Sequence, residues 1–242
     1  MAQRRSRIRF LAVALVACMG LAAEPSALAG GAPVVTSGSR SRPWIALTFD
    51  DGWGVANCRR VVAILQETDT PATFLPTAGN VRGAPAFWRR VAQLGYPIGN
   101  HTVHRRVLRG VPQWRQVREI ADARTIIEGI TGVPMAPVLR PPTGAYDATT
   151  RRVALRLGFS AILLWDTTFA DTSHRPGGGD WPLSAYLRAA TRGGRGSIVL
   201  AHCGSDVTVR ILRQVIATYR ARGLRFVTVP QLLGPAGDAP GD

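Results

Sequence analysis

Short apolar runs alternate with longer amphipathic runs from residue 44 almost to the end of the chain. The short runs are rich in β-branched and aromatic side chains, which is typical of buried strands. The longer runs repeat apolar residues every three or four positions, which predicts helices with one buried face. The predicted strands are 44–49, 72–75, 96–99, 138–139, 160–165, 198–201 and 225–229, and the predicted helices are 56–67, 84–94, 112–130, 147–157, 182–192 and 205–222.

Strict alternation of strands and helices predicts an α/β fold with a parallel sheet covered by helices. A doubly wound open sheet and a closed barrel both satisfy this pattern. In either architecture the carboxyl ends of the strands gather at one edge, where functional side chains are usually found. We therefore expect the polar residues that follow the strands to share one site.

The first 29 residues have the three-part pattern of a secretory signal peptide. Four arginines precede an apolar run from Phe10 to Ala23, and Ala27-Leu28-Ala29 offers small residues for cleavage. The run is shorter than the roughly 20 residues that cross a bilayer, so we expect no membrane span in the mature form. The alternatives are an uncleaved N-terminal anchor and a lipobox, Leu15 to Cys18, that would make Cys18 a lipidated N-terminus.

These patterns divide the chain into four parts. Residues 1–29 are the predicted signal peptide, and the small, polar, proline-bounded residues 30–43 are predicted to be a linker. Residues 44–235 form the predicted domain, and 236–242 are predicted to be a flexible tail. The protein is therefore expected to be secreted or associated with the cell wall, with lipoprotein anchoring as the alternative.

The charge of the chain points to an anionic surface as a partner. All 30 basic residues are arginines, against 15 acidic residues, and the net charge of +15 becomes +12 without residues 1–29. A secreted protein this basic is attracted to an anionic cell wall. Nucleic acid is not expected to be a partner, because the arginines are spread over many predicted helices without interleaved aromatic residues.

Two cysteines, Cys58 and Cys203, follow the predicted signal peptide. A disulfide is permitted outside the cytoplasm. Two buried free thiols are the interpretation that we prefer from the sequence.

Two of the predicted strands end in residues that suit a metal site. Asp50-Asp51-Gly52 follows the first strand, and adjacent carboxylates repel each other unless a cation or an arginine neutralises them. His101 and His104 follow the third strand, and on a helical turn both rings could reach one ion. One carboxylate and two imidazoles leave open positions on the metal, as hydrolytic zinc sites require. Taken singly, a solvated turn and structural histidines explain these residues equally well.

Three further strand ends supply polar groups. Arg140 precedes two prolines and could hold a carboxylate from a neighbouring strand, although a rigid loop with a surface arginine is the alternative. The backbone N–H of Thr143 is a candidate oxyanion donor. Trp165 ends the fifth strand, and His202 ends the sixth, where it could protonate a leaving amine. His174 lies in a glycine-rich loop and is expected to be exposed.

Four of these segments, taken in order, resemble the motifs of the polysaccharide deacetylases, also called the NodB-homology or carbohydrate esterase family 4 domain. They are Thr48-Phe49-Asp50-Asp51-Gly52, His101-Thr102-Val103-His104, Arg140-Pro141-Pro142-x-Gly144 and Leu200-x-His202. The resemblance covers roughly residues 44–233. It implies a distorted (β/α) barrel of about seven units with parallel strands.

The resemblance also implies roles for individual residues. Asp51, His101 and His104 would bind a divalent metal, usually Zn²⁺, with Co²⁺ or Ni²⁺ as alternatives. Asp50 would be the catalytic base, oriented by Arg140, and His202 the catalytic acid. The remaining implied roles are tuning of His202 by Asp171, support of the metal loop by Thr102, and substrate contacts by Thr143, Tyr146, Trp165 and Leu200, with Leu200 lining the acetyl pocket.

Two departures from the family pattern concern the substrate and the acid. Thr143 stands where the family usually has an aromatic residue, and Tyr146 could partly replace it. The family's fourth motif places its acidic residue at Asp171 and its tryptophan at Thr172, while Asp180-Trp181 is a competing assignment.

The implied activity is hydrolysis of N-acetyl groups on a glycan, either a chitin-like oligomer or peptidoglycan, to free amine and acetate. Two alternatives remain open. The same site could act as an O-acetyl esterase on an acetylated polysaccharide such as xylan, or the protein could be a catalytically silent, secreted module that binds the cell wall.

Overall fold

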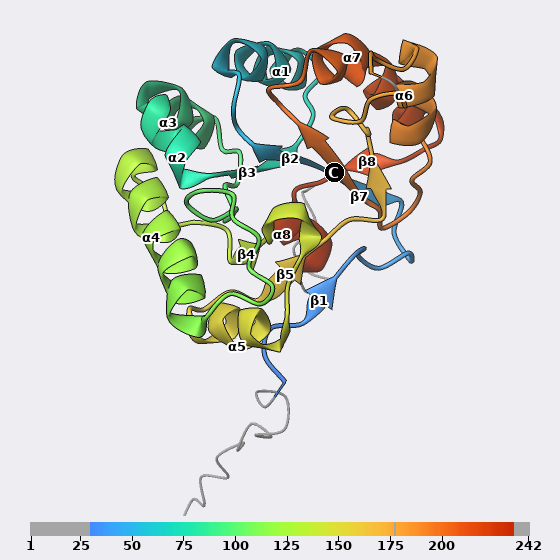
Figure 1. Cartoon of the computed structure of the whole chain (residues 1–242). Helices are drawn as coiled ribbons and strands as arrows, with labels where there is room; N and C mark the ends of the chain where they lie inside the picture. Colours follow the sequence, from blue (N-terminus) through green and yellow to red (C-terminus); the bar gives the residue numbers. More distant parts are fainter. Residues whose placement is uncertain (1–29, 177, 235–242) are drawn as a thin grey trace, which may run out of the picture.

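The computed structural model describes residues 30–176 and 178–234, in which parallel strands form the centre and helices surround them (Figure 1). One set of strands runs in the order β3 (Ala72–Pro76), β2 (Trp44–Asp51), β7 (Ile198–His202) and β6 (Thr167–Thr168), and β8 (Arg225–Phe226) pairs with the start of β2. The other set runs in the order β1 (Val34–Val35), β5 (Ala161–Leu163) and β4 (Val138–Leu139).

Single bridges join the two sets of strands into a distorted barrel. Phe74 of β3 bridges to Ile98, and Asn100 bridges to Leu139 of β4, both in parallel. An antiparallel bridge from Ser37 to Ser197 connects the other side. The predicted fold class is therefore confirmed, with one difference: 96–99 forms a single isolated bridge, at Ile98, instead of a strand, because Pro97 has no backbone N–H to donate.

The helices follow the strands along the chain. They are α1 (Val55–Glu67), α2 (Ala78–Gly83), α3 (Pro85–Gln93), α4 (Gln113–Thr131), α5 (Ala148–Arg156), α6 (Leu183–Ala190), α7 (Asp206–Ala221) and α8 (Val229–Leu233). Helices α2 and α8 are not predicted by the sequence pattern, because each is too short to show a helical period. No helix within the described ranges combines the length and apolar character that a membrane crossing requires.

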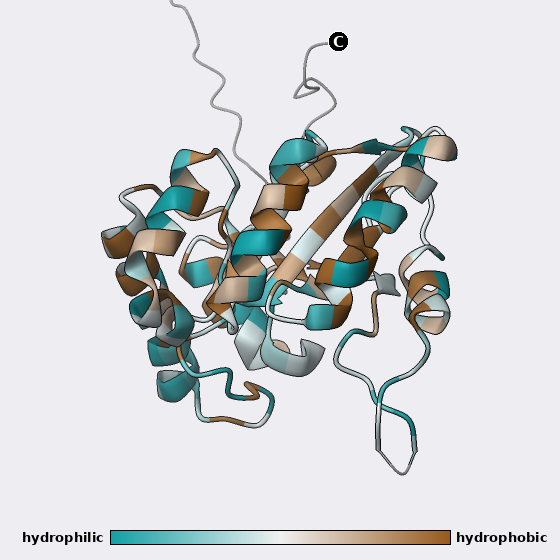
Figure 2. Cartoon of the chain, turned by 90° about the horizontal axis from the view of Figure 1, so that it is seen from above, coloured by the Kyte–Doolittle hydropathy of each residue, from teal (hydrophilic) through white to brown (hydrophobic). Residues whose placement is uncertain are grey.

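The apolar core leaves one end of the barrel for polar side chains. Figure 2 shows apolar residues along the central strands and alternating apolar and polar positions along the outer helices. Val229 and Leu232 of α8 pack with Trp44 and Ile198, which begin β2 and β7. This cluster fills the amino end of the barrel, so the carboxyl ends of the same strands are where buried polar groups gather.

Residues 30–43 belong to the fold, so their interpretation as a linker is wrong. Val34 and Val35 pair with Ile162 and Leu163 of β5, and Ala32 is fully buried. Most of its residues are small or polar, so their side chains do not predict a strand, but the backbone of Val34 and Val35 pairs with β5. Residues 1–29 and 235–242 lie outside the described residues. They include the predicted signal peptide, the lipidation site at Cys18 and the predicted tail (236–242).

Cys58 and Cys203 form a disulfide, so the preferred interpretation as free thiols is wrong. Cys58 lies on α1 and Cys203 directly follows β7, and their Cα atoms are 4.5 Å apart. Both side chains are fully buried in the core cluster where α1 and α7 meet. The bond closes a loop across 145 positions of the chain, and it ties α1 to the end of β7.

Replacing both residues, Cys58→Ala with Cys203→Ala, is expected to lower the free energy of unfolding by about 2–5 kcal/mol, because the unfolded chain loses a long covalent loop. Urea unfolding of the full chain, with and without a thiol reductant, measures this change. The reductant should destabilise the native chain and leave the double variant unaffected. An unfolding midpoint of the native chain that does not respond to full reduction would contradict the expectation.

Candidate active site

Two neighbouring strands bring the central groups of the site together. Strand β2 is buried along all eight residues and ends in Asp50 and Asp51, whose exposed fractions are 3% and 1%. Strand β7 lies parallel to it and ends in His202, which is the register partner of Asp50. The predicted acid and base are thus placed side by side by the pairing of β2 with β7.

Arg140 holds Asp50 from inside the barrel. It follows β4, is fully buried, and its Nη1 lies 2.6 Å from Asp50 Oδ1 and 2.9 Å from Thr48 Oγ1. The other nitrogens donate to the carbonyl oxygens of Leu163 and Leu164, at 3.2 and 3.1 Å. The guanidinium is therefore fixed by β2 and by the end of β5, and the predicted contact with a neighbouring carboxylate is present.

His101 faces both aspartates with its Nε2 atom. Its Nδ1 lies 2.7 Å from the carbonyl oxygen of Arg140, and because a carbonyl only accepts, Nδ1 carries the hydrogen. Nε2 then points to Asp51 Oδ1 at 3.3 Å and to Asp50 Oδ2 at 3.9 Å. His101 Nε2 and Asp51 Oδ1 therefore face each other, and both are atoms that could bind a metal ion.

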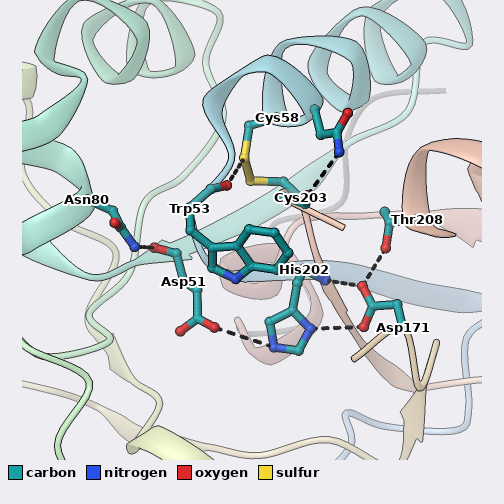
Figure 3. Close-up of a disulfide and its surroundings, with 10 residues drawn as sticks. Asp51, Trp53, Cys58, Asn80, Asp171, His202, Cys203 and Thr208 are labelled. Atoms are coloured by element: carbon teal, nitrogen blue, oxygen red, sulfur yellow. Dashed lines mark hydrogen bonds and ion pairs between the residues drawn. A yellow bond between two sulfur atoms is a disulfide. The ribbon is translucent and has the colours of Figure 1, made fainter. Parts of the chain in front are cut away.

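Asp171 holds His202 in place (Figure 3). The carboxylate of Asp171 accepts from His202 Nδ1 at 2.9 Å and from the His202 backbone N–H at 2.8 Å. The hydroxyl of Thr208 also donates to it. The competing residue, Asp180, lies in an exposed pair with His174, so the structure brings Asp171 and not Asp180 to His202.

The surroundings of His202 favour its protonated form. Burial alone lowers the pKa of an imidazole, but the hydrogen bond to Asp171 and the charges of Asp171, Asp50 and Asp51 outweigh it and raise the pKa of His202. Its Nε2 is 3.7 Å from Asp51 Oδ2. His202 therefore keeps its proton to a higher pH than a free imidazole does.

His104 does not reach this cluster. The prediction assumed a helical turn, but 101–108 is irregular, and Thr102 has a left-handed backbone with φ of 67°. The His104 side chain is 60% exposed, and its Nδ1 bonds to Glu119 of α4 at 2.8 Å. The expectation that three-residue spacing brings both rings to one ion is therefore wrong.

Arg105 takes the place that His104 was expected to fill. Its Nε donates to Asp51 Oδ1 at 2.6 Å, the same oxygen that faces His101. Burial alone raises the pKa of Asp51, but contact with His101 and the charges of His101, Arg105 and His202 outweigh it and lower the pKa. Each of the two adjacent carboxylates is thus paired with a guanidinium.

The donor set does not fit the predicted divalent metal. Zn²⁺ in a hydrolytic site takes three protein ligands, and only Asp51 and His101 of the predicted three converge. Within residues 30–176 and 178–234, no three His, Cys, Asp or Glu side chains are arranged to hold an ion. The oxygen that Asp51 would share with His101 is already bound to a cation, Arg105.

Of the predicted substrate contacts, Trp165 and Leu200 lie beside residues of the site. Thr143 is exposed and has a left-handed backbone with φ of 60°, in the short 3₁₀ turn Pro142–Gly144. Tyr146 and Trp165 are half-buried, and the Trp165 ring centroid lies 5.6 Å from the Arg140 guanidinium carbon. Leu200 is buried in β7 beside Thr48.

The hydroxyl of Thr102 does not give the support expected for the metal loop. It is buried and has no hydrogen-bond partner within the part of the chain that the structure describes. The backbone carbonyl of Thr102 instead accepts from the N–H of Ala78 at the start of α2.

Trp53 is a site residue that the sequence analysis missed. It follows Asp51 and Gly52, is 41% exposed, and its carbonyl oxygen lies 3.2 Å from Cys58 Sγ (Figure 3). Its ring rests on Gly204, where an added Cβ would come within 2.5 Å of it, so only glycine fits. The signal available in the sequence was an aromatic residue just after the paired aspartates.

Comparisons with known proteins agree with this architecture. A family model described as polysaccharide deacetylase matches residues 37–162. A peptidoglycan-N-acetylglucosamine deacetylase of Bacillus cereus is 27% identical, over 78% of this chain and 87% of the relative. The peptidoglycan-N-acetylmuramic acid deacetylase PdaA of Bacillus subtilis is 26% identical, over 81% of this chain and 73% of the relative.

A solved structure shares the fold. It is a pseudoenzyme of carbohydrate esterase family 4 from Bacillus anthracis, with a TM-score of 0.76 and 21% identity, over 84% of this chain and 69% of that one. The motifs, the parallel barrel and the family match together lead to one conclusion: the chain belongs to the polysaccharide deacetylase family.

Proposed function

We propose that this protein hydrolyses the acetamido groups of an amino-sugar glycan, with peptidoglycan as the substrate class. The observation that carries the proposal is the pair of fixed groups at the ends of β2 and β7. Asp50 is bound by the buried Arg140, and His202 is bound by Asp171. The substrate class is supported by the relatives, which are named as peptidoglycan deacetylases.

In the proposed reaction, Asp50 takes a proton from a water molecule whose oxygen bonds to the acetyl carbon. The carbonyl oxygen gains negative charge, and the backbone N–H of Thr143 is the proposed donor to it. Protonated His202 then gives its Nε2 proton to the sugar nitrogen, and the carbon–nitrogen bond breaks. The products are acetate and the free amine.

We also propose that the protein works outside the cytoplasm. The disulfide between Cys58 and Cys203 supports this location, because such bonds persist in oxidising compartments. The basic and apolar pattern of residues 1–29 supports export. The excess of arginine supports attraction to an anionic cell wall.

A second candidate function is glycan binding without turnover. The observation that favours it is the ion pair between Arg105 and Asp51, which occupies the oxygen that a catalytic metal would use. Exposed Trp53 gives such a protein an aromatic surface for a sugar ring. Acetate release separates the two candidates.

Asp50→Asn is expected to lower acetate release from peptidoglycan at least about 100-fold, because the amide cannot take a proton from water. Acetate and new free amine are measured together, with N-acetylglucosamine oligomers and acetylated xylan as parallel substrates. The matched control is Glu67→Gln, since Glu67 is 55% exposed at the end of α1. It should retain native activity.

Full activity of the Asp50→Asn variant would refute the proposed base. Binding of the native protein to peptidoglycan with no acetate release from any of the three substrates would favour the binding candidate. Release from xylan alone would identify an O-acetyl esterase.

Asp171→Asn is expected to lower the pKa of His202, because it removes the carboxylate that stabilises the imidazolium. The acid form is required, so activity should be lost as pH rises through the pKa of His202, and this loss should move to lower pH in the variant. NMR titration of the His202 ring measures the pKa without substrate. The matched control is Asp180→Asn, which alters the exposed His174 pair only. A shift with Asp180→Asn and none with Asp171→Asn would contradict the assignment.

A further inference from the structure

We propose that the Arg105 guanidinium replaces the divalent ion of the site, and that residue 105 is the position that decides whether this barrel binds a metal. The inference rests on the proposed function in one respect, that the reaction takes place at the cluster of Asp50, Asp51, His101 and His202. Metal binding is measured without substrate, so the two can fail separately.

The first support is the atom that Arg105 contacts. Its Nε is 2.6 Å from Asp51 Oδ1, and His101 Nε2 is 3.3 Å from the same oxygen. Oδ1 is thus the Asp51 oxygen that faces His101, and an ion shared by the two residues through this oxygen would meet Arg105. Arg105 must therefore leave before an ion can enter at this position.

The second support is the charge of the cluster. Asp50 and Asp51 bring two negative charges into a buried site, and Arg140 and Arg105 bring two positive charges within 2.6 Å of them. The Asp51 side chain is 2% exposed, so an unpaired charge there would be costly. With both arginines in place, the charge of the carboxylates is balanced without an ion.

The third support is the direction of the neighbouring side chains. His104 turns to α4, where Glu119 accepts from its ring and from its backbone N–H. Arg105 has a left-handed backbone with φ of 58° and turns to Asp51 instead. Position 105, and not position 104, is therefore the one whose side chain reaches the cluster.

An imidazole at position 105 would complete the set of Asp51, His101 and a second histidine. Histidine is one of the residues that tolerate a left-handed backbone, so the loop can keep its course. Arg105 is 52% exposed, so its replacement leaves no cavity in the core. The variant Arg105→His should therefore gain a metal site that the native chain does not have.

The test is calorimetric titration of the tag-free full chain with Zn²⁺ after treatment with chelator. Native protein and Arg105→Gln, which removes the charge without adding an imidazole, are expected to bind no ion at this cluster. Arg105→His should bind about one equivalent. Adding His104→Ala to Arg105→His should keep this binding, and adding Asp51→Asn should abolish it. Circular dichroism confirms that each variant is folded.

Binding of one equivalent of Zn²⁺ by the native chain, lost in both Asp51→Asn and His104→Ala, would overturn the inference, because it would make His104 the third ligand. Absence of binding by folded Arg105→His would overturn the role of position 105. Acetate release by native protein should persist in chelator, and its loss there would also count against the inference. A native chain that neither releases acetate nor binds Zn²⁺ would refute the proposed hydrolysis while leaving the metal inference intact.

Discussion

The two adjacent carboxylates at the end of the fully buried strand β2 determine which other charged groups the site must contain. Asp50 and Asp51 have lost nearly all contact with water, so each needs a positive partner close by. Arg140 reaches Asp50 from the end of β4, and Arg105 reaches Asp51 from the loop after Asn100. Strand β4 and that loop must therefore lie where their arginines can neutralise the two carboxylates at the end of β2.

The backbone of the site is bent to bring these charges together. Side chains along a strand point alternately to opposite faces, which would separate Asp50 from Asp51. The left-handed backbone of Asp51, with φ of 64°, breaks this alternation, and both carboxylates lie within 3.9 Å of His101 Nε2. Thr102, Arg105 and Thr143 are also left-handed, so strain collects where the site is built. Asp69, in the turn between α1 and the start of β3, is left-handed as well, with φ of 45°.

The sequence predicted the parts of the site that depend on strand ends. Asp50, Asp51, His101, Arg140 and His202 each follow an apolar run, and parallel pairing brings such positions to one edge whatever the loops do. His104 and Arg105 lie in a loop, where one residue more or less turns the side chain elsewhere, so spacing alone could not place them. The disulfide was missed for a related reason: a contact across 145 positions depends on how α1 packs beside β7.

Family membership therefore determines less of the chemistry than of the architecture. The parallel barrel positions Asp50 beside His202 through the register of β2 and β7, and this pairing holds for any loop sequence. The cation that balances Asp51 comes from a single exposed loop, where a side chain can change without disturbing the core. On the proposal that Arg105 takes the place of an ion, two proteins with this barrel and the same Asp50–His202 pair would differ in metal content by one residue, because the fold fixes the anion and the loop supplies the cation.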